Sequence, residues 1–412
     1  MNSVSVAPVN QCESDKGLDS WKVDDDLRTA YENLSSELYT RAISIMDQNM
    51  VMKPDPTAMD CIAGVLSNSQ IVALNIMGSE IRPNTFEGSR PDYEIRNARR
   101  DEIPQISEWR YKEFGYRAHI DYLLNVYDSD PEGWFVAVLS SGEVIGNVVG
   151  MILNDQVAFG GLYCVKKEYR CHGIGSELWK ARMKHVQPRN LGLNSVDTRI
   201  QSNLKLGMKA SFNIATYVGT VTPQKIENIK RIYSNDSSLD QSKETNRFSI
   251  LKLNSLTVKD YMDTLISYDT KIHSIERTQF LKAMTIGSKD TTVALALSKE
   301  TPESELTIVG YGLLKPRHVG SNIGPLYADN SAVGQALLGT LIGELNPTSH
   351  SLLDISVVED ATPSPRQSIV KTFILSLELV RECLITRMYS QMSVALPLPK
   401  VYSIFSTEAF LV

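Results

Sequence analysis

The sequence has few cysteines and no excess of basic residues. Its 412 residues include an odd number of cysteines without a Cys-x-x-Cys pair, namely Cys12, Cys61, Cys164, Cys171 and Cys383. This pattern argues against a disulfide framework or a zinc site and favours free thiols in a reducing compartment, so no metal is expected. Lysine and arginine are scattered, and the net charge is −6. A nucleic-acid-binding protein would show a basic stripe, so no nucleic-acid partner is expected.

Long apolar runs and targeting signals are also missing. No stretch approaches the ~18 apolar residues of a membrane span, so no membrane association is expected. The opening residues MNSVSVAPVNQCESDKG lack the apolar core of a signal peptide, the first arginine is Arg28, and Asn2 excludes myristoylation. We therefore expect a cytoplasmic protein. An oligomer is compatible with the sequence but is not indicated by it.

The length exceeds the ~100–200 residues of an ordinary domain and predicts more than one. Residues 1–91 are interpreted as a helical N-terminal extension, because apolar residues recur at helical spacing from Leu27 to Ile45. Residues 92–221 alternate strand and helix patterns, and 255–412 repeat this rhythm. The polar segment 222–254 is interpreted as a linker or long loop. The prediction is a mixed α/β fold with two related domains in tandem.

The stretch YRCHGIGS, at 169–176, combines a cation, two glycines and a hydroxyl between a predicted strand and a predicted helix. The first amides of a helix have no partner within it, and together with the helix dipole they attract phosphate oxygens. Glycine at Gly173 and Gly175 allows the backbone to approach a bulky anion. Arg170 adds charge and Ser176 adds a donor, so the stretch is interpreted as a pyrophosphate site. A purely structural glycine turn is the alternative.

Two well-known glycine loops fit less well. A Walker A loop needs Gly-Lys-Ser/Thr after four spacer residues, which is absent. A dinucleotide-binding loop needs a third glycine, where this chain has Leu178, and should directly follow the first strand. Here a charged turn intervenes, and several predicted strands precede it.

The arrangement Arg-x-x-Gly-x-Gly after a strand that ends in Cys164 and Val165 resembles motif A of the GNAT acyltransferase superfamily. The surrounding order of predicted strands and helices, β-α-α-β-β-β-α-β, agrees with this family. The segments GYGLLKPR, GPLYADN and TRMYS of the second domain resemble the YitH/HolE-like two-domain acetyltransferases. The resemblance implies tandem domains, each with a central mixed, mostly antiparallel sheet flanked by helices.

The resemblance also implies coenzyme A as the acyl carrier, in the form of acetyl-CoA or another acyl-CoA. Its pantetheine arm would lie along 162–165, and its pyrophosphate on the glycine loop. The cofactor-binding candidates are Leu162, Cys164, Val165, Arg170, Cys171, His172, Gly173, Ile174, Gly175 and Ser176. His172 can add charge near phosphate or be a solvated loop residue. An acceptor amine would attack the thioester directly in a ternary complex.

Two catalytic candidates follow from the resemblance. Family members often place a tyrosine, which protonates the leaving thiolate, four residues before a glycine; here Gly207 matches and Asn203 takes the tyrosine position. An amide donates hydrogen bonds but supplies no titrating proton near neutral pH. His119, between the first two predicted helices, is a candidate base on the acceptor side. Its alternative role is to cap a helix.

The second domain is expected to lack a coenzyme A site. Its counterpart of the glycine loop, LYADNSAVGQALL, has no paired glycines, and Asp329 is predicted to cap the helix. Tyr327 and Arg387 are candidates for shaping the acceptor pocket from this domain, which can alternatively be a structural repeat. The predicted function is acyl transfer from coenzyme A to an amino group of a small molecule. The alternatives are a catalytically impaired acyl-CoA-binding or regulatory protein, and a protein N-acetyltransferase.

Overall fold

The computed structural model describes residues 91–234, 248–298, 305–345, 351–359 and 364–405, which belong to one compact unit. The predicted N-terminal helical extension lies outside these residues. The first half of the described chain contains β1 (Tyr93–Asn97), α4 (Ile103–Phe114), α5 (Ile120–Ser129), β2 (Trp134–Leu139), β3 (Val144–Ile152), β4 (Val157–Val165), α6 (Ile174–Val186), β5 (Asn190–Val196), α7 (Asp197–Lys205) and β6 (Lys209–Val221).

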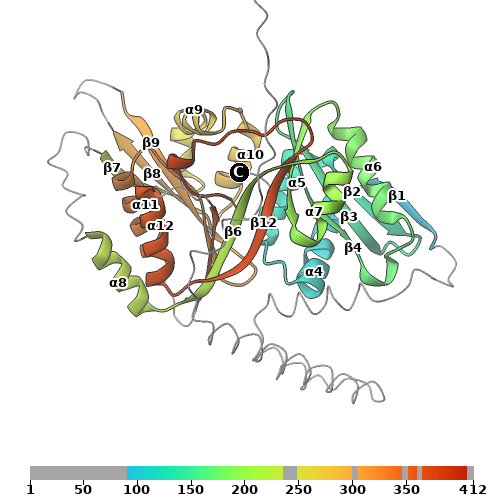
Figure 1. Cartoon of the computed structure of the whole chain (residues 1–412), viewed down its shortest axis with the longest axis horizontal. Helices are drawn as coiled ribbons and strands as arrows, with labels where there is room; N and C mark the ends of the chain where they lie inside the picture. Colours follow the sequence, from blue (N-terminus) through green and yellow to red (C-terminus); the bar gives the residue numbers. More distant parts are fainter. Residues whose placement is uncertain (1–90, 235–247, 299–304, 346–350, 360–363, 406–412) are drawn as a thin grey trace, which may run out of the picture. The chain divides into compact units, whose positions relative to one another are not determined.

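The second half repeats this order of elements. After α8 (Pro223–Ser234) come β7 (Phe248–Leu253), α9 (Met262–His273), α10 (Thr278–Thr285), β8 (Thr292–Ser298), β9 (Thr307–Pro316), β10 (Ser321–Ala328), α11 (Ser331–Gly343), β11 (Ser351–Val358), α12 (Pro365–Ser376), β12 (Val380–Tyr389) and β13 (Val401–Ser403). The predicted tandem organisation is therefore visible as two successive β-α-α-β-β-β-α-β-α-β series (Figure 1).

The two halves share one sheet. Within the described residues its order is β1-β2-β3-β4-β5-β12-β6-β11-β10-β9-β8-β7, and β13 pairs with β10. The β4–β5 and β10–β11 pairs are parallel, and the other pairs are antiparallel. The predicted fold class, mixed and mostly antiparallel sheet flanked by helices, is confirmed.

The halves exchange their last strands at the centre of the sheet (Figure 1). β12, from the second half, lies between β5 and β6, with Arg387 opposite Asn194 of β5. β6, from the first half, lies between β12 and β11, with Tyr217 opposite Ile355. Both neighbours of β6 therefore come from the second half, although β6 belongs to the range 92–221 in sequence.

An apolar core joins the halves on one face of the sheet. Ile106 of α4 and Leu123 of α5 belong to the same buried cluster as Leu265 of α9 and Phe280 of α10. The opposite face is covered by α6 in the first half and by α8, α11 and α12 in the second. Since buried aliphatic and aromatic side chains each stabilise a fold by roughly 1.5–3 kcal/mol, the shared core couples the stability of the two halves.

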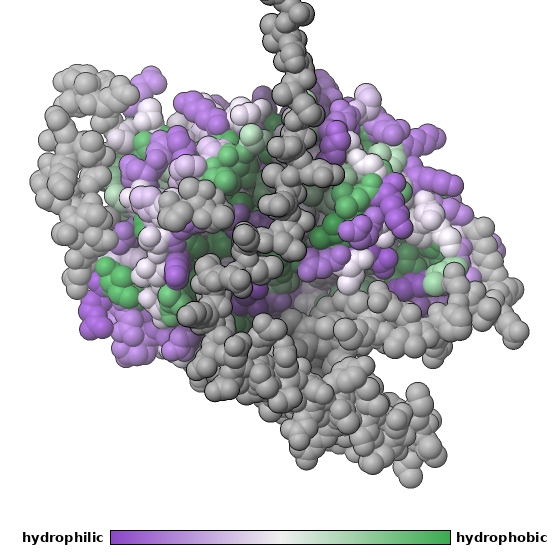
Figure 2. Space-filling view, viewed as in Figure 1, coloured by the Kyte–Doolittle hydropathy of each residue, from purple (hydrophilic) through white to green (hydrophobic). Residues whose placement is uncertain are grey.

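The prediction of a polar linker over 222–254 is wrong at both of its ends. Residues 223–234 form α8, and 248–253 form β7; only 235–247 lie outside the described residues. In α8 the buried residues are Ile226, Ile229 and Tyr233, at helical spacing. Hydrophilic residues gather over its outer face (Figure 2). In the sequence, the charged residues of the exposed side obscured the helical spacing of these three apolar residues.

Candidate functional site

β4 and β5 separate half-way along their length. Val157–Gly160 pair in parallel with Asn190–Leu193, but beyond Gly160 the described residues of β5 make no pair with β4. On its other edge β4 stays paired with β3, through a bulge between Asn147 and Val149. Leu162 lies in the bulge with φ of 49°, and its carbonyl accepts a hydrogen bond from Asn147 Nδ2 at 2.5 Å. The separation leaves one edge of 161–165 open to an extended ligand.

The turn after β4 leads directly into the N-terminus of α6. Cys171 and Gly173 have φ of 68° and 84°, so residues with a left-handed backbone conformation alternate with residues of negative φ. Such alternation turns successive amides toward one side and makes an anion-binding concavity. The described residues provide no hydrogen-bond partner for the amides of Ile174, Gly175 and Ser176. The predicted anion site is therefore present in the geometry of the helix start.

The two glycines have different reasons to be glycine. A Cβ at Gly173 would meet nothing within 4 Å, so the requirement there is its positive φ. A Cβ at Gly175 would lie 2.8 Å from Tyr163 Oη, so the requirement there is space. Tyr163 of β4, 44% exposed, thus lies against the first turn of α6. The fold thus places the Tyr163 hydroxyl beside the unpaired amides of this helix.

Arg170 connects the turn after β4 to neighbouring elements. Its Nη2 forms an ion pair of 2.6 Å with Glu113 Oε1 of α4, and its Nε donates to the Val165 carbonyl at 2.9 Å. The guanidinium also lies 5.5 Å from the centre of the Phe114 ring. The charge of Arg170 is therefore already matched by a carboxylate, and the unpaired amides of α6 are the main attraction for an anion.

The other predicted residues of this site fall around the same helix start. Ile174 is buried and anchors α6, whereas Cys171 and Ser176 are exposed. His172 Nδ1 lies 3.3 Å from the Tyr169 carbonyl, so its ring is held within the turn. In β4, Cys164 is 8% exposed, and burial raises the pKa of its thiol, which therefore stays protonated and unreactive.

Asn203 lies in the last turn of α7, beside the open end of β5. Its side-chain Nδ2 donates to Ser195 Oγ at 2.9 Å, and its backbone carbonyl accepts a hydrogen bond from the Met208 amide. Ser195 itself is 2% exposed. The amide thus fixes α7 on β5 and presents no ionisable proton there.

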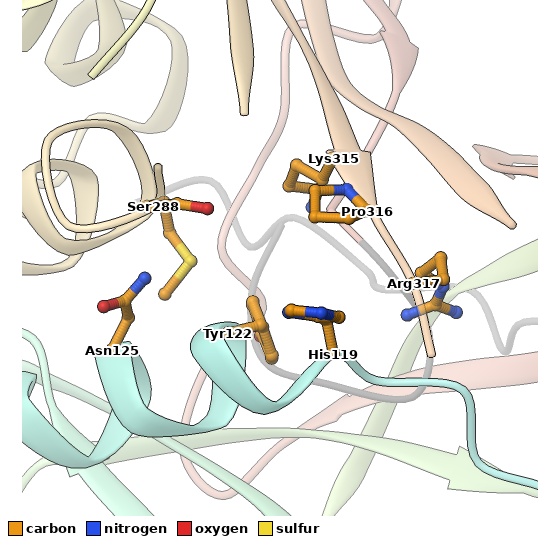
Figure 3. Close-up of a pocket in the computed structure, with 8 residues that line it drawn as sticks. His119, Tyr122, Asn125, Ser288, Lys315, Pro316 and Arg317 are labelled. Atoms are coloured by element: carbon orange, nitrogen blue, oxygen red, sulfur yellow. The ribbon is translucent and has the colours of Figure 1, made fainter. Parts of the chain in front are cut away.

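His119 lies elsewhere. Its Nδ1 accepts a hydrogen bond from the Asp121 amide at 3.3 Å, so His119 is the N-cap of α5, as its alternative interpretation predicted. It also lines a pocket with residues of the second half, among them Lys315 and Arg317 (Figure 3). The structure thus gathers 162–176 into one site and places His119 in another.

Arg387 contributes to the site from the second half. Its Nε donates to Asn194 Oδ1 of β5 at 2.8 Å, and its guanidinium lies 4.5 Å from the centre of the Phe159 ring of β4. It is 1% exposed, and burial lowers its pKa. Behind it, Tyr327 packs edge-on against His273. The sequence pointed to Tyr327 and Arg387, but only the strand exchange explains how Arg387 reaches β4 and β5.

Arg182 of α6 is a site residue that sequence reasoning missed. It is 1% exposed and stacks on Trp179, with 4.0 Å between its guanidinium and the ring centre. Its Nη1 lies 2.8 Å from where a Cβ of Gly160 would be, at the point where β4 and β5 part. Burial lowers its pKa to about 10, so it remains a cation at neutral pH. Its spacing from Trp179 gave no signal beyond that of an ordinary helix.

The equivalent place in the second half is filled. β10 and β11 pair only over Ser321–Ile323 and Leu353–Ile355, and β13 then pairs with β10 at Leu326 and Tyr327. The Ile404 amide, just beyond β13, donates to the Ser356 carbonyl of β11 at 2.9 Å. The chain's own strand therefore occupies the gap that stays open between β4 and β5.

The helix start in the second half is capped. The N-cap of α11 is Asn330, whose side chain accepts from the Val333 amide at 3.0 Å, so the prediction of Asp329 as the cap is wrong by one residue. Asp329 instead accepts hydrogen bonds from Tyr268 Oη and Lys400 Nζ. Asn330 has the extended backbone that a cap requires, whereas Asp329 ends the strand by donating its amide to the Val309 carbonyl.

Comparison with known proteins agrees with this arrangement. Residues 103–205 match the model of the acetyltransferase (GNAT) family, and residues 265–402 match that of the acetyltransferase (GNAT) domain. The chain belongs to the GNAT superfamily. Both models match because both halves keep the GNAT order of elements, even though β6 and β12 are exchanged.

The related proteins are distant. An uncharacterized protein of Caenorhabditis elegans is 24% identical over 60% of this chain and 73% of its own length. The holothin acyltransferase of a Pseudoalteromonas strain is 20% identical over 57% of this chain and 69% of its own. A putative acetyltransferase from Pyrococcus horikoshii has a similar fold, with a TM-score of 0.54 and 15% identity over 80% of this chain and 99% of that chain.

The described residues contain neither a membrane-spanning helix nor a cluster of metal ligands. No helix in them combines the length and the apolar composition that spanning a bilayer requires. They contain no group of three or more His, Cys, Asp or Glu side chains placed to hold a metal ion.

Proposed function

We propose that this GNAT protein transfers an acetyl or longer acyl group from coenzyme A to an amino group of a small molecule, with its active site in the first half. The observation that carries the proposal is the open separation of β4 and β5 beside the unpaired amides of Ile174–Ser176. An extended chain ending in a pyrophosphate fits both features, because one offers strand edges and the other offers amide donors.

Coenzyme A would supply the activated acyl group as a thioester. In our proposal the amides of α6 hold its pyrophosphate, and the free edge of 161–165 holds its amide-bearing arm. In this proposal the buried side chains of Arg387 and Phe159, with the half-buried Asn194, form a wall beside the reacting end, so the second half helps to exclude water there. The amine loses a proton as its nitrogen attacks the carbonyl, and the departing thiolate takes one.

A catalytically impaired acyl-CoA-binding protein is the second candidate, and Asn203 favours it. Its side-chain amide is engaged by Ser195 and cannot protonate a thiolate. In this case the site would bind acyl-CoA without turnover.

The test uses the full chain with acetyl-CoA and a panel of primary amines and amino acids, and measures release of the free thiol. Acyl transfer is expected with at least one amine and is expected to be lost in Gly173→Asp, which brings a carboxylate to the anion site. Lys180→Ala, an exposed change on α6, is the matched control and should leave turnover unchanged. Binding of acetyl-CoA without turnover of any amine would favour the second candidate, and absence of binding would contradict both.

A further inference from the structure

A pocket at the seam between the halves contains a buried lysine without a counter-ion. It lies between the start of α5 in the first half and β9 and the end of α10 in the second, and its lining includes His119, Asn125, Met284, Lys315 and Pro316 (Figure 3). Lys315 is 7% exposed. Within the described part of the chain its ammonium has no hydrogen bond or ion pair, and it lies 3.8 Å from the centre of the Phe405 ring.

The charges around Lys315 do not balance. The carboxylate whose charge acts on Lys315 is that of Asp354. It is already paired with Arg317 at 2.9 Å and accepts a hydrogen bond from Asn322 at 2.6 Å. Burial and the charge of Arg317 hold the pKa of Lys315 well below its ordinary value. A buried cation is costly unless it is paired, so a negative charge that enters the pocket would favour the protonated form of Lys315.

A second polar group in the pocket also lacks a partner. Asn125 is 7% exposed, and its Nδ2 has no hydrogen-bond acceptor among the described residues. An unpaired buried donor is costly, so a ligand that accepts a hydrogen bond from it gains affinity. Lys315 and Asn125 thus offer an ammonium and an amide donor from opposite halves of the chain, while Met284 and Pro316 add apolar contacts.

We propose that this pocket binds a carboxylate, which pairs with Lys315 and accepts a hydrogen bond from Asn125. The enclosed space has room for only a few atoms, which suits the carboxylate end of a ligand with a short aliphatic tail. The carboxylate belongs either to a free small acid or to a larger ligand that also carries an amine. This site is separate from the glycine loop and does not depend on acyl transfer.

The test measures thermal unfolding of the full chain without coenzyme A, as sodium acetate replaces sodium chloride at constant ionic strength. A saturable rise in the melting temperature is expected with acetate and not with neutral acetamide. Lys315→Met should abolish the rise, and it should fold because an apolar side chain replaces a buried cation. Asn125→Leu should weaken binding by about tenfold. Lys289→Met, an exposed change beside Ser288, should behave like the wild type.

Glycine and glycinamide distinguish the two sources of the carboxylate. If acetate stabilises the wild type, the site takes a free small acid. If only glycine does so, and glycinamide does not, the carboxylate belongs to an amine-bearing ligand. The proposal is overturned if neither acetate nor glycine gives a saturable shift, or if the shift persists in Lys315→Met. Because coenzyme A is omitted, these results are independent of whether the chain transfers acyl groups.

Discussion

At the start of α6, Gly175 and Tyr163 set how closely β4 can approach the helix. The 2.8 Å between Tyr163 Oη and a Cβ at position 175 leaves no room for a side chain. A methyl group there must move either the ring or the first turn, and the first turn carries the unpaired amides of Ile174–Ser176. The close approach of Tyr163 to Gly175 thus controls the shape of the anion site.

Gly175→Ala is expected to weaken coenzyme A binding by about tenfold, because a moved turn loses a charge-assisted hydrogen bond or more. Calorimetric titration of the full chain measures this. Tyr163→Phe in the Gly175→Ala background removes the opposing hydroxyl and should restore part of the affinity. Wild-type affinity in Gly175→Ala alone would show that the contact does not shape the site.

His273 provides a test of the buried cluster behind Arg387. Burial and the charge of Arg277 lower the pKa of His273 to about 3, so the folded protein keeps it neutral. The unfolded chain takes up this proton below its ordinary pKa of about 6.5. Stability from this group is therefore complete above pH 6.5 and is lost as the pH falls toward 3.

His273→Phe should reduce the pH dependence of the free energy of unfolding between pH 6 and 4 by up to about 1.4 kcal/mol per pH unit. Urea denaturation at several pH values measures the slope. His318→Phe, at an exposed position, is the control and should keep the wild-type slope. An unchanged slope in His273→Phe would mean that His273 is protonated in the folded state.

At the scale of elements, the two halves differ in what occupies the separation in their sheet. β13 fills the gap between β10 and β11, and Asn330 caps α11; the gap between β4 and β5 is open in the described residues, and α6 has no side-chain cap. The two halves have the same order of elements, but they thus differ in what the separation between their strands can bind.

Asn330→Ala should lower the free energy of unfolding by about 0.5–2 kcal/mol, because the cap hydrogen bond to the Val333 amide is lost. Coenzyme A affinity should not change, since α11 is not expected to bind it. Urea denaturation and calorimetry on the same samples test both statements. A loss of affinity would place part of the coenzyme A site in the second half.

The start of α6 could be predicted from the sequence, whereas the pairing and packing of the elements around it could not. The strand–loop–helix around Gly173 was predictable because turn glycines and helix periodicity are local signals. Local signals do not specify pairing partners, so the exchange of β6 and β12 could not be predicted, and neither could the contacts of Arg387. Charged residues obscured the apolar stripe of α8 in the sequence. Asp329 and Asn330 are both good capping residues, and only the backbone conformation, which the sequence does not show, decides which of them caps α11.

For the whole molecule, the exchanged strands make the halves dependent on each other. β6 pairs only with β11 and β12 within the described residues, and the apolar core that contains Leu123 also contains Phe280. A half expressed alone would expose an apolar face and unpaired strand edges.

Residues 91–222 and 223–412, each expressed alone, are expected not to fold, and co-expression should yield a folded complex. The dispersion of amide resonances in heteronuclear NMR spectra measures folding in each sample. The full chain is the positive control. A dispersed spectrum for either half alone would contradict the dependence that the strand exchange implies.

The central claim is that one half binds coenzyme A and the other cannot. Calorimetric titration of the full chain with coenzyme A tests it most directly. One site per chain is expected, with binding lost in Gly173→Asp and kept in Asn330→Ala. Two sites per chain, or undiminished binding in Gly173→Asp, would contradict the claim.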